Sequence, residues 1–232
     1  MEKVSVFPNQ RFTLWAIGYL LFQMLALPTI LTLVFFLANL PLDNSRLNFL
    51  YYIVNFTAMV VISWRFLEDS LRHALKNLGA VLITAVVGLV LYWFSSSLVD
   101  LGIRYFLPDF SNVNDDNIAT MAQDQLPVWA FATIVLVPPV EELIFRGALF
   151  GGIYRHNKIL GWIVSVLGFA LVHTIGYIGQ YSWNTLLICT VQYLPAGICF
   201  AAAYRKSGNI ITPILMHAAV NSIAMLSLAA MQ

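Results

Sequence analysis

Residues 138–146 read PPVEELIFR and place two carboxylates and a guanidinium inside an apolar run that covers residues 128–153. Ionisable side chains are costly in the hydrocarbon of a membrane, and those that occur there are usually functional. Glu142 and Arg146 are four residues apart, so on a helix they share one face and we expect them to form an ion pair. Glu141 lies about 100° further round the helix and needs a partner from another helix. The sequence therefore predicts that Glu141 is the functional group of this segment.

Two prolines, Pro138 and Pro139, directly precede the acidic pair. Because proline has no backbone N–H, the carbonyl groups of about residues 134 and 135 lose their helical partners, which predicts a kink and local hydration. A carboxylate beside a hydrated kink is placed to act as a general base.

The composition is that of a polytopic membrane protein. Of the 232 residues, 60% are hydrophobic and only 10% are charged, and the mean hydropathy is +0.80, far outside the range of soluble domains. The formal net charge of +1 and the lack of a glycine-rich phosphate loop argue against nucleic-acid or nucleotide binding. The two cysteines, Cys189 and Cys199, are ten residues apart in one apolar segment, so neither a disulfide framework nor a thiolate metal site is indicated.

Seven apolar segments predict an all-α bundle of seven transmembrane helices. Most are close to or above the length of about 20 residues that spans hydrocarbon. The segments are residues 12–37, 47–67, 78–98, 128–154, 159–177, 183–203 and 210–230. We expect a bend at Pro28 in the first of them, and close helix contact at the glycine pair Gly147 and Gly151. Residues 99–127 form the longest connection, which is acidic and predicts a short interfacial helix.

Lysine and arginine residues are distributed unequally between the two ends of the predicted helices. With the amino terminus on the cytoplasmic side, that side carries nine of them: Lys3, Arg11, Arg65, Arg72, Lys76, Arg155, Lys158, Arg205 and Lys206. The opposite side carries only Arg46 and Arg104. Positive residues favour the cytoplasmic side, so the sequence predicts a cytoplasmic amino terminus, an external carboxyl terminus and an external acidic loop.

Polar side chains recur in two of the later predicted helices. His173 follows Phe169 by four residues on one face, and Asn221 follows His217 by four residues on one face of the last helix. Judged from the polar residues that bracket each helix, these groups and Glu141 lie within about 6 Å of a common plane. Three separate helices therefore bring polar groups to one depth near the middle of the bilayer.

Each of these polar residues, taken alone, also has a purely structural explanation. A single histidine or asparagine in a membrane helix often makes only an interhelical hydrogen bond worth about 1 kcal/mol. The pair of Glu142 and Arg146 satisfies itself and is expected to be structural. Packing alone does not explain why the remaining polar groups share one depth.

Taken in order, the three motifs resemble those of a known family. They are EExxxR at residues 141–146, FxxxH at residues 169–173 and HxxxN at residues 217–221. The pattern is similar to that of the CPBP intramembrane proteases, also called the Abi family, which includes CAAX proteases, bacteriocin-processing proteins and type II CAAX prenyl endopeptidases. The resemblance covers roughly residues 127–230, while the three helices before it share only hydrophobicity.

The resemblance implies a division of roles among four residues. Glu141 and His173 would hold and deprotonate a water that attacks a peptide carbonyl, while His217 and Asn221 would donate hydrogen bonds to the developing oxyanion. Such chemistry is reasonable in a site of low dielectric, where donors aimed at an oxyanion contribute several kcal/mol.

The resemblance also implies a structural role for Arg146 and raises the question of a metal cofactor. Arg146, paired with Glu142, would keep the motif helix in register. No cofactor is favoured, but the family has been described both as metalloproteases and as metal-free glutamate proteases, and Glu141, His173 and His217 together are suited to hold a divalent metal such as zinc. Neither a His-Glu-x-x-His zinc signature nor a Gly-x-Ser-x-Gly elbow is present, which favours a metal-free site.

The expected protein is one integral membrane domain. Residues 1–126 would supply the first helices and the external acidic loop, and residues 127–232 would supply the catalytic core. The expected partners are the lipid bilayer and a membrane-associated protein or peptide substrate in a bacterial cell membrane, with no nucleic acid. Neither an oligomeric state nor a cleavage site is predicted.

Two other classes of function are compatible with the sequence. The helices could form a non-catalytic bacteriocin-immunity or scaffold protein, in which Glu141 is dispensable. Buried glutamate and histidine residues also make proton relays in transporters, although the chain shows no evident inverted repeat and no pair of broken helices.

Overall fold

The computed structural model describes residues 10–41, 43–123 and 125–231 of the chain. Within these ranges every regular element is helical, and the one β-type contact is an isolated bridge between Ile178 and Tyr181. The all-α membrane bundle predicted from the sequence is therefore confirmed. Lys3, counted above on the cytoplasmic side, and Asp124 of the acidic connection lie outside the described residues.

The first predicted span is a bent pair of helices. α1 (Gln10–Leu25) and α2 (Leu27–Leu37) meet at an angle of 49°. The break lies at Ala26, because Pro28 occupies the first turn of α2, where its missing N–H leaves no helical hydrogen bond unmade. The bend expected at this proline is thus present, two residues before the proline itself.

Two long helices and a short one follow. α3 (Asn44–Lys76) and α4 (Leu78–Phe106) bury only 17% of their most apolar windows inside the protein, which leaves the rest of those windows for lipid. α4 continues to Phe106, beyond the predicted end at residue 98, and so shortens the acidic connection. The predicted short helix of that connection is α5 (Val113–Ala122), and Asn112 caps it by accepting a hydrogen bond from the Asn114 amide at 3.0 Å.

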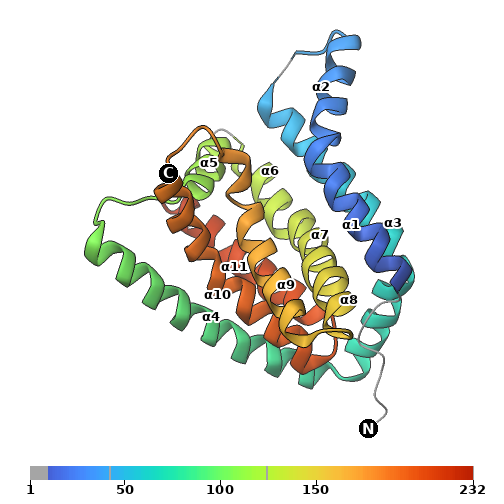
Figure 1. Cartoon of the computed structure of the whole chain (residues 1–232). Helices are drawn as coiled ribbons and strands as arrows, with labels where there is room; N and C mark the ends of the chain where they lie inside the picture. Colours follow the sequence, from blue (N-terminus) through green and yellow to red (C-terminus); the bar gives the residue numbers. More distant parts are fainter. Residues whose placement is uncertain (1–9, 42, 124, 232) are drawn as a thin grey trace.

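The motif lies on one continuous helical rod that contains two π-helical stretches. The rod consists of α6 (Leu126–Phe131), the π-helical turn η1 (Ala132–Leu136), α7 (Val137–Glu142), the π-helical stretch η2 (Leu143–Phe150) and α8 (Gly151–Tyr154). More than half of its apolar window, 56%, is buried inside the protein. It is the central helix of the bundle, with α9 on one side and α1 and α3 on the other (Figure 1).

The fifth span is shorter than predicted. The sequence predicted a helix over residues 159–177, but α9 (Lys158–Val172) ends earlier, and a turn and the 3₁₀ helix η3 (Ile175–Tyr177) follow. His173 is the C-cap of α9 and does not lie in the helix interior. Its Nδ1 lies 2.7 Å from the carbonyl oxygen of Phe169, in the last turn of α9.

Two further helices, α10 (Trp183–Ser207) and α11 (Ile211–Ala229), complete the bundle. In the part of the chain that the structure describes, five helical rods are long and apolar enough to cross a bilayer, and the bent pair α1–α2 makes a sixth. The 15-residue α9 is a seventh, shorter apolar pass, so the predicted number of about seven is roughly met. Consecutive passes alternate in direction, which brings the turns after α3, α8 and α10 to one end (Figure 1).

Glycines allow α1 to approach the central rod. Gly147 faces the rings of Phe12 and Phe66 at 3.5 Å, and a Cβ at Gly152 would overlap the side chain of Thr13 on α1. The Gly152→Leu substitution is therefore expected to lower the free energy of unfolding by about 1–3 kcal/mol, because the β-branched Thr13 side chain is short and cannot move aside.

This expectation is checked by the midpoint of thermal unfolding in detergent. The matched control is Gly102→Leu, since a Cβ at Gly102 on α4 meets nothing within 4 Å. Equal midpoints for the two variants would show that α1 does not depend on this contact.

Candidate active site

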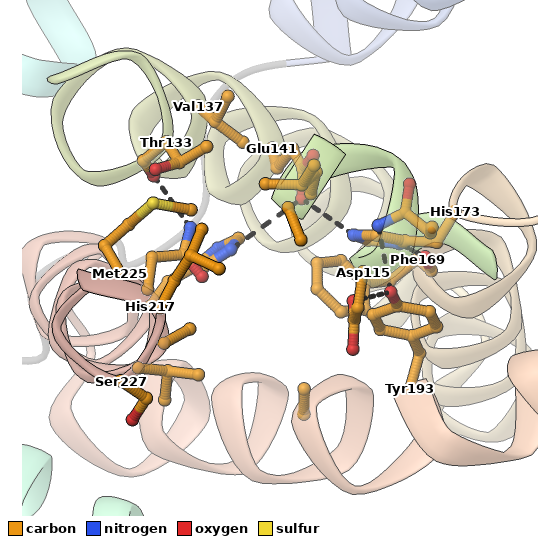
Figure 2. Close-up of a pocket in the computed structure, with 18 of the residues that line it drawn as sticks. Asp115, Thr133, Val137, Glu141, Phe169, His173, Tyr193, His217, Met225 and Ser227 are labelled. Atoms are coloured by element: carbon orange, nitrogen blue, oxygen red, sulfur yellow. Dashed lines mark hydrogen bonds and ion pairs between the residues drawn. The ribbon is translucent and has the colours of Figure 1, made fainter. Parts of the chain in front are cut away.

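A cavity of about 520 Å³ opens beside the central rod. All four residues predicted to be catalytic line it: Glu141, His173, His217 and Asn221. Figure 2 shows Glu141 between the two histidines, which come from the end of α9 and from α11. The structure thus brings the polar groups of three separate helices to one chamber, and their chemical roles remain predictions.

Glu141 faces both imidazoles without touching either. Its Oε2 lies 3.8 Å from Nε2 of His173 and 4.0 Å from Nε2 of His217. These distances exceed that of a direct hydrogen bond and suit two groups bridged by one water. The same oxygen is buried and accepts no hydrogen bond from any side chain or backbone group that the structure describes. It is therefore placed to bind a water and take a proton from it.

His173 presents an unprotonated nitrogen to Glu141. Its Nδ1 lies 2.7 Å from the Phe169 carbonyl oxygen, and because a carbonyl can only accept, Nδ1 carries the proton. In the neutral ring Nε2 then has a free lone pair. The ring itself stacks on Tyr193, with centroids 4.1 Å apart and planes inclined by 20°.

The ion pair of Glu142 and Arg146 is present and also orients the second imidazole. Oε1 of Glu142 accepts from Nη1 of Arg146 at 3.0 Å and from Nδ1 of His217 at 2.9 Å, and both members of the ion pair are fully buried. The guanidinium also donates to two backbone carbonyls of α10 at 3.3 Å. It lies 4.1 Å from the ring centroid of Phe169. The contacts that this pair makes outside the central rod therefore join α9, α10 and α11 to it.

Asn221 binds a carbonyl that the prolines release. In η1 the Val137 amide bonds to the Ala132 carbonyl, and Pro138 has no N–H to offer, so the Thr133 carbonyl lacks these helical partners. Nδ2 of Asn221 donates to this carbonyl at 2.7 Å. The sequence placed such an opening one or two residues further on, and the longer hydrogen-bonding step of the π-helical turn accounts for the difference.

Three residues of α5 and α10 belong to this region and had no signal in the sequence. The hydroxyl of Tyr193 donates to Oδ1 of Asp115 at 2.7 Å and accepts from Nδ2 of Asn114 at 2.9 Å. Asp115 lines the cavity and is exposed, yet partial desolvation raises the pKa of its carboxyl, against which the hydrogen bond from Tyr193 acts.

The groups suggested as metal ligands are spaced more widely than the ligands of a tetrahedral zinc ion. Ligands of a tetrahedral zinc, each about 2.0–2.1 Å from the metal, lie about 3.3 Å from one another. Oε2 of Glu141 is 3.8 Å and 4.0 Å from the two imidazole nitrogens. Over residues 10–41, 43–123 and 125–231, no three side chains of His, Cys, Asp or Glu are grouped as a metal site.

Comparisons with known proteins point to one family. Residues 123–223 match the family model described as type II CAAX prenyl endopeptidase Rce1-like. UPF0177 protein YxdF of Lactococcus lactis is 29% identical over 163 residues, which is 69% of this chain and 84% of YxdF. The putative membrane peptidase YdiL of Bacillus subtilis is 24% identical over 195 residues, which is 80% of this chain and 75% of YdiL.

A third relative carries a more specific name. The membrane-embedded CAAX protease MroQ of Staphylococcus aureus is 22% identical over 116 residues, which is 49% of this chain and 44% of MroQ. No solved structure gives a significant match. The matches confirm the resemblance that the three motifs indicated, and the matched region contains all of those motifs.

Proposed function

We propose that this chain, a relative of the Rce1-like and membrane-peptidase proteins, hydrolyses a peptide bond of a membrane-associated protein or peptide. One observation carries the proposal: Glu141, His173 and His217 converge on a single cavity within a membrane bundle. The carboxylate oxygen lies 3.8 Å and 4.0 Å from the two imidazole nitrogens, and we propose that the attacking water binds between these groups.

The proposed reaction needs only this water and the groups around it. Glu141 and His173 together take a proton from the water while its oxygen attacks the carbonyl carbon, and the carbonyl π electrons move to oxygen. The tetrahedral oxyanion then re-forms a carbonyl group, the C–N bond breaks, and the departing amine takes the proton back. One water is consumed, and a new carboxyl end and a new amino end are formed.

To donate a hydrogen bond to the oxyanion, His217 has to carry a proton on each of its two ring nitrogens. Its Nδ1–H is already given to Glu142 at 2.9 Å, so Nε2 can donate only in the imidazolium form. Glu142 stabilises that positive charge, and Glu141 faces it from the other side at 4.0 Å. Asn221 gives one amide hydrogen to Thr133 and keeps the second for the oxyanion.

A chelation experiment tests the proposed absence of a metal in the reaction. Purified protein is incubated with EDTA or phenanthroline, dialysed and assayed for peptide cleavage, and the rate is expected to stay unchanged because the bridging-water geometry needs no metal ion. Loss of cleavage that added zinc restores would instead assign Glu141, His173 and His217 as metal ligands.

The function itself is tested by mass spectrometry of membrane peptides from cells that carry the parent protein or the Glu141→Gln variant. We expect two adjoining peptides, produced by cleavage of one bond, that are present only in cells with the parent protein. The same experiment names the substrate, for which a membrane-protein tail, a bacteriocin leader, a pheromone precursor and a prenylated CAAX protein are the proposed classes. Identical peptide sets, with full biological complementation by Glu141→Gln, would favour a non-catalytic immunity or scaffold role.

The orientation in the membrane is part of the proposal. The turns after α3, α8 and α10 share one end of the bundle and carry Lys76, Arg155, Lys158, Arg205 and Lys206. This concentration of positive charge supports a cytoplasmic location for that end, with α5 and the carboxyl terminus outside. The relatives named above come from bacteria, which supports the bacterial cell membrane as the location.

A further inference from the structure

We propose that Tyr193 is a positioning residue that holds His173 in its reactive orientation, and that α5 in turn holds Tyr193. The inference rests on the proposed function, since it assigns how the base of that reaction is kept in place. It adds two elements, α5 and the middle of α10, to a site otherwise made by the central rod, the end of α9 and α11.

His173 needs such support because of where it lies. It is the residue at which α9 ends, and the chain turns away immediately after it. One edge of the ring is fixed by the Phe169 carbonyl at 2.7 Å. Two aromatic rings restrain rotation about that contact: the Phe169 ring is tilted by 59° with its centroid 4.8 Å away, and the Tyr193 ring lies nearly parallel, inclined by 20°, with its centroid 4.1 Å away. Tyr193 supplies the only stacked face among these contacts, and without it Nε2 can rotate away from Glu141.

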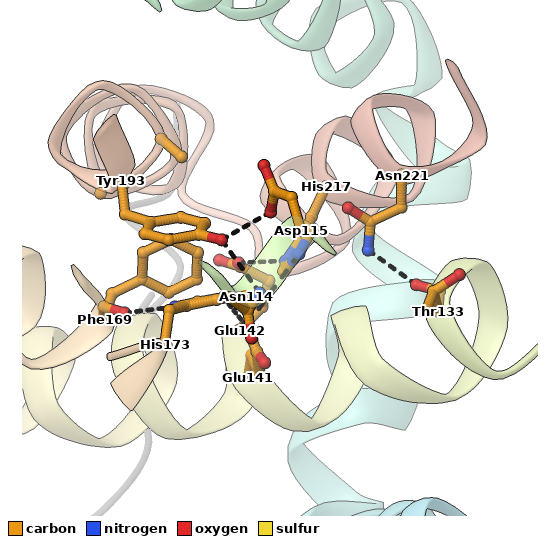
Figure 3. Close-up of polar contacts among 12 residues, drawn as sticks. Asn114, Asp115, Thr133, Glu141, Glu142, Phe169, His173, Tyr193, His217 and Asn221 are labelled. Atoms are coloured by element: carbon orange, nitrogen blue, oxygen red, sulfur yellow. Dashed lines mark hydrogen bonds and ion pairs between the residues drawn. The ribbon is translucent and has the colours of Figure 1, made fainter. Parts of the chain in front are cut away.

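Tyr193 is itself held from α5. Its hydroxyl donates to Asp115 at 2.7 Å and accepts from Asn114 at 2.9 Å, and Figure 3 shows both contacts beside the stacked imidazole. These two hydrogen bonds fix the position of the phenol ring in its own plane, which a stacking contact alone does not do.

α5 is tied to the bundle by a second polar chain. Nδ2 of Asn112 donates to Gln192 at 2.8 Å, and Gln192 donates to Oδ1 of Asp100 on α4 at 3.1 Å. Asn112 is buried, so water does not replace these bonds easily. The segment between α4 and the central rod, which contains α5, therefore supports the imidazole of His173 through the ring of Tyr193.

The first test is a double-mutant cycle on cleavage of an identified peptide substrate. Tyr193→Leu is expected to lower kcat by about 10–100-fold with little change in KM, because a misplaced base of this kind costs on the order of 10²-fold. In the His173→Ala background the same substitution is expected to add no further loss. Additive losses, or a loss confined to KM, would overturn the positioning role, since either result would mean that Tyr193 acts on the substrate or on stability alone.

Partial variants separate the two contacts of Tyr193. Tyr193→Phe keeps the stacked ring and loses the hydroxyl, so its kcat is expected to lie between those of the parent and Tyr193→Leu. Asp115→Ala is expected to match Tyr193→Phe. Asp116→Ala serves as the control, because Asp116 accepts from Ser111 at the surface and does not line the cavity. An Asp115→Ala variant with the activity of the parent would show that α5 does not hold Tyr193 in place.

A readout independent of cleavage keeps this inference separate from the proposed function. The rate at which diethyl pyrocarbonate modifies His173, followed by mass spectrometry, is expected to rise several-fold in Tyr193→Leu because the ring is released. Tyr181→Leu is the control, since Tyr181 is exposed and lies outside the cavity lining. Unchanged modification in Tyr193→Leu would refute the positioning role even if the protein cleaves peptides, whereas a parent protein that cleaves nothing would refute the function alone.

Discussion

Glu141→Gln is expected to lower kcat/KM for peptide cleavage by about 10²–10⁴-fold, the range of a lost general base. Glutamine has the shape of glutamate but cannot take a proton from water. The fold is expected to survive, because Oε2 of Glu141 accepts no hydrogen bond from the part of the chain that the structure describes. The measurement is the cleavage rate of purified protein in liposomes, together with the thermal midpoint of the same preparation.

Two further variants test whether the loss of cleavage is specific to the proposed site. Glu68→Gln repeats the same chemical change on an exposed residue of α3 that pairs with Arg72, and it is expected to cleave like the parent. His173→Ala is expected to lose activity to a similar extent as Glu141→Gln, since both hold the same proton in the proposed reaction. If Glu141→Gln and His173→Ala both cleave at the rate of the parent, the protease assignment is wrong.

Arg146→Met is expected to lower the free energy of unfolding by about 3–5 kcal/mol, the cost of removing one partner from a buried ion pair. The substitution leaves the Glu142 carboxylate fully buried with His217 as its only hydrogen-bond partner among the described residues. It also removes two bonds to carbonyls of α10 and the contact with the Phe169 ring. Equilibrium unfolding in mixed detergent measures the difference.

The control uses the other arginine that is paired at a spacing of four residues. Arg72 and Glu68 are largely exposed, with 72% and 41% of their side chains accessible, so Arg72→Met is expected to change stability by less than about 1 kcal/mol. The double substitution Glu142→Gln with Arg146→Met should be more stable than Arg146→Met alone, because it also removes the unpaired charge. A single Arg146→Met variant as stable as the parent would show that the pair is not needed for packing.

Local spacing in the sequence accounts for what could be predicted. Hydrophobic runs of about 20 residues predicted the helices, and a proline inside the first apolar segment predicted its bend. The four-residue spacing of Glu142 and Arg146 predicted their ion pair, which the structure shows at 3.0 Å. Each of these features depends on residues within one helical segment, which is why the sequence was sufficient.

The remaining features depend on tertiary contacts. The bond between Glu142 and His217 joins residues 75 positions apart, and nothing in either motif specifies that partner. Tyr193 lies in an apolar helix where an aromatic ring is ordinary packing, and Asp115 lies in an acidic stretch that reads as a solvated loop. The end of α9 at Val172, before the end of the apolar segment at residue 177, is a boundary that hydropathy does not register.

The two π-helical stretches of the central rod constrain how its length can vary. A π-helical turn holds an extra residue compared with an α-helical one, so deleting one residue between positions 132 and 136 would allow η1 to relax to ordinary α geometry. The backbone would tolerate such a deletion, because the wide turn absorbs its extra residue within one turn and the helix after it would keep its rotation about the rod axis. Glu141 would then still face its two histidines. Among homologues that keep this site, a one-residue gap in an alignment is therefore expected to be tolerated within the five positions of η1, whereas a one-residue gap in the α-helical turn of α7 before Glu141 would rotate that side chain by about 100°.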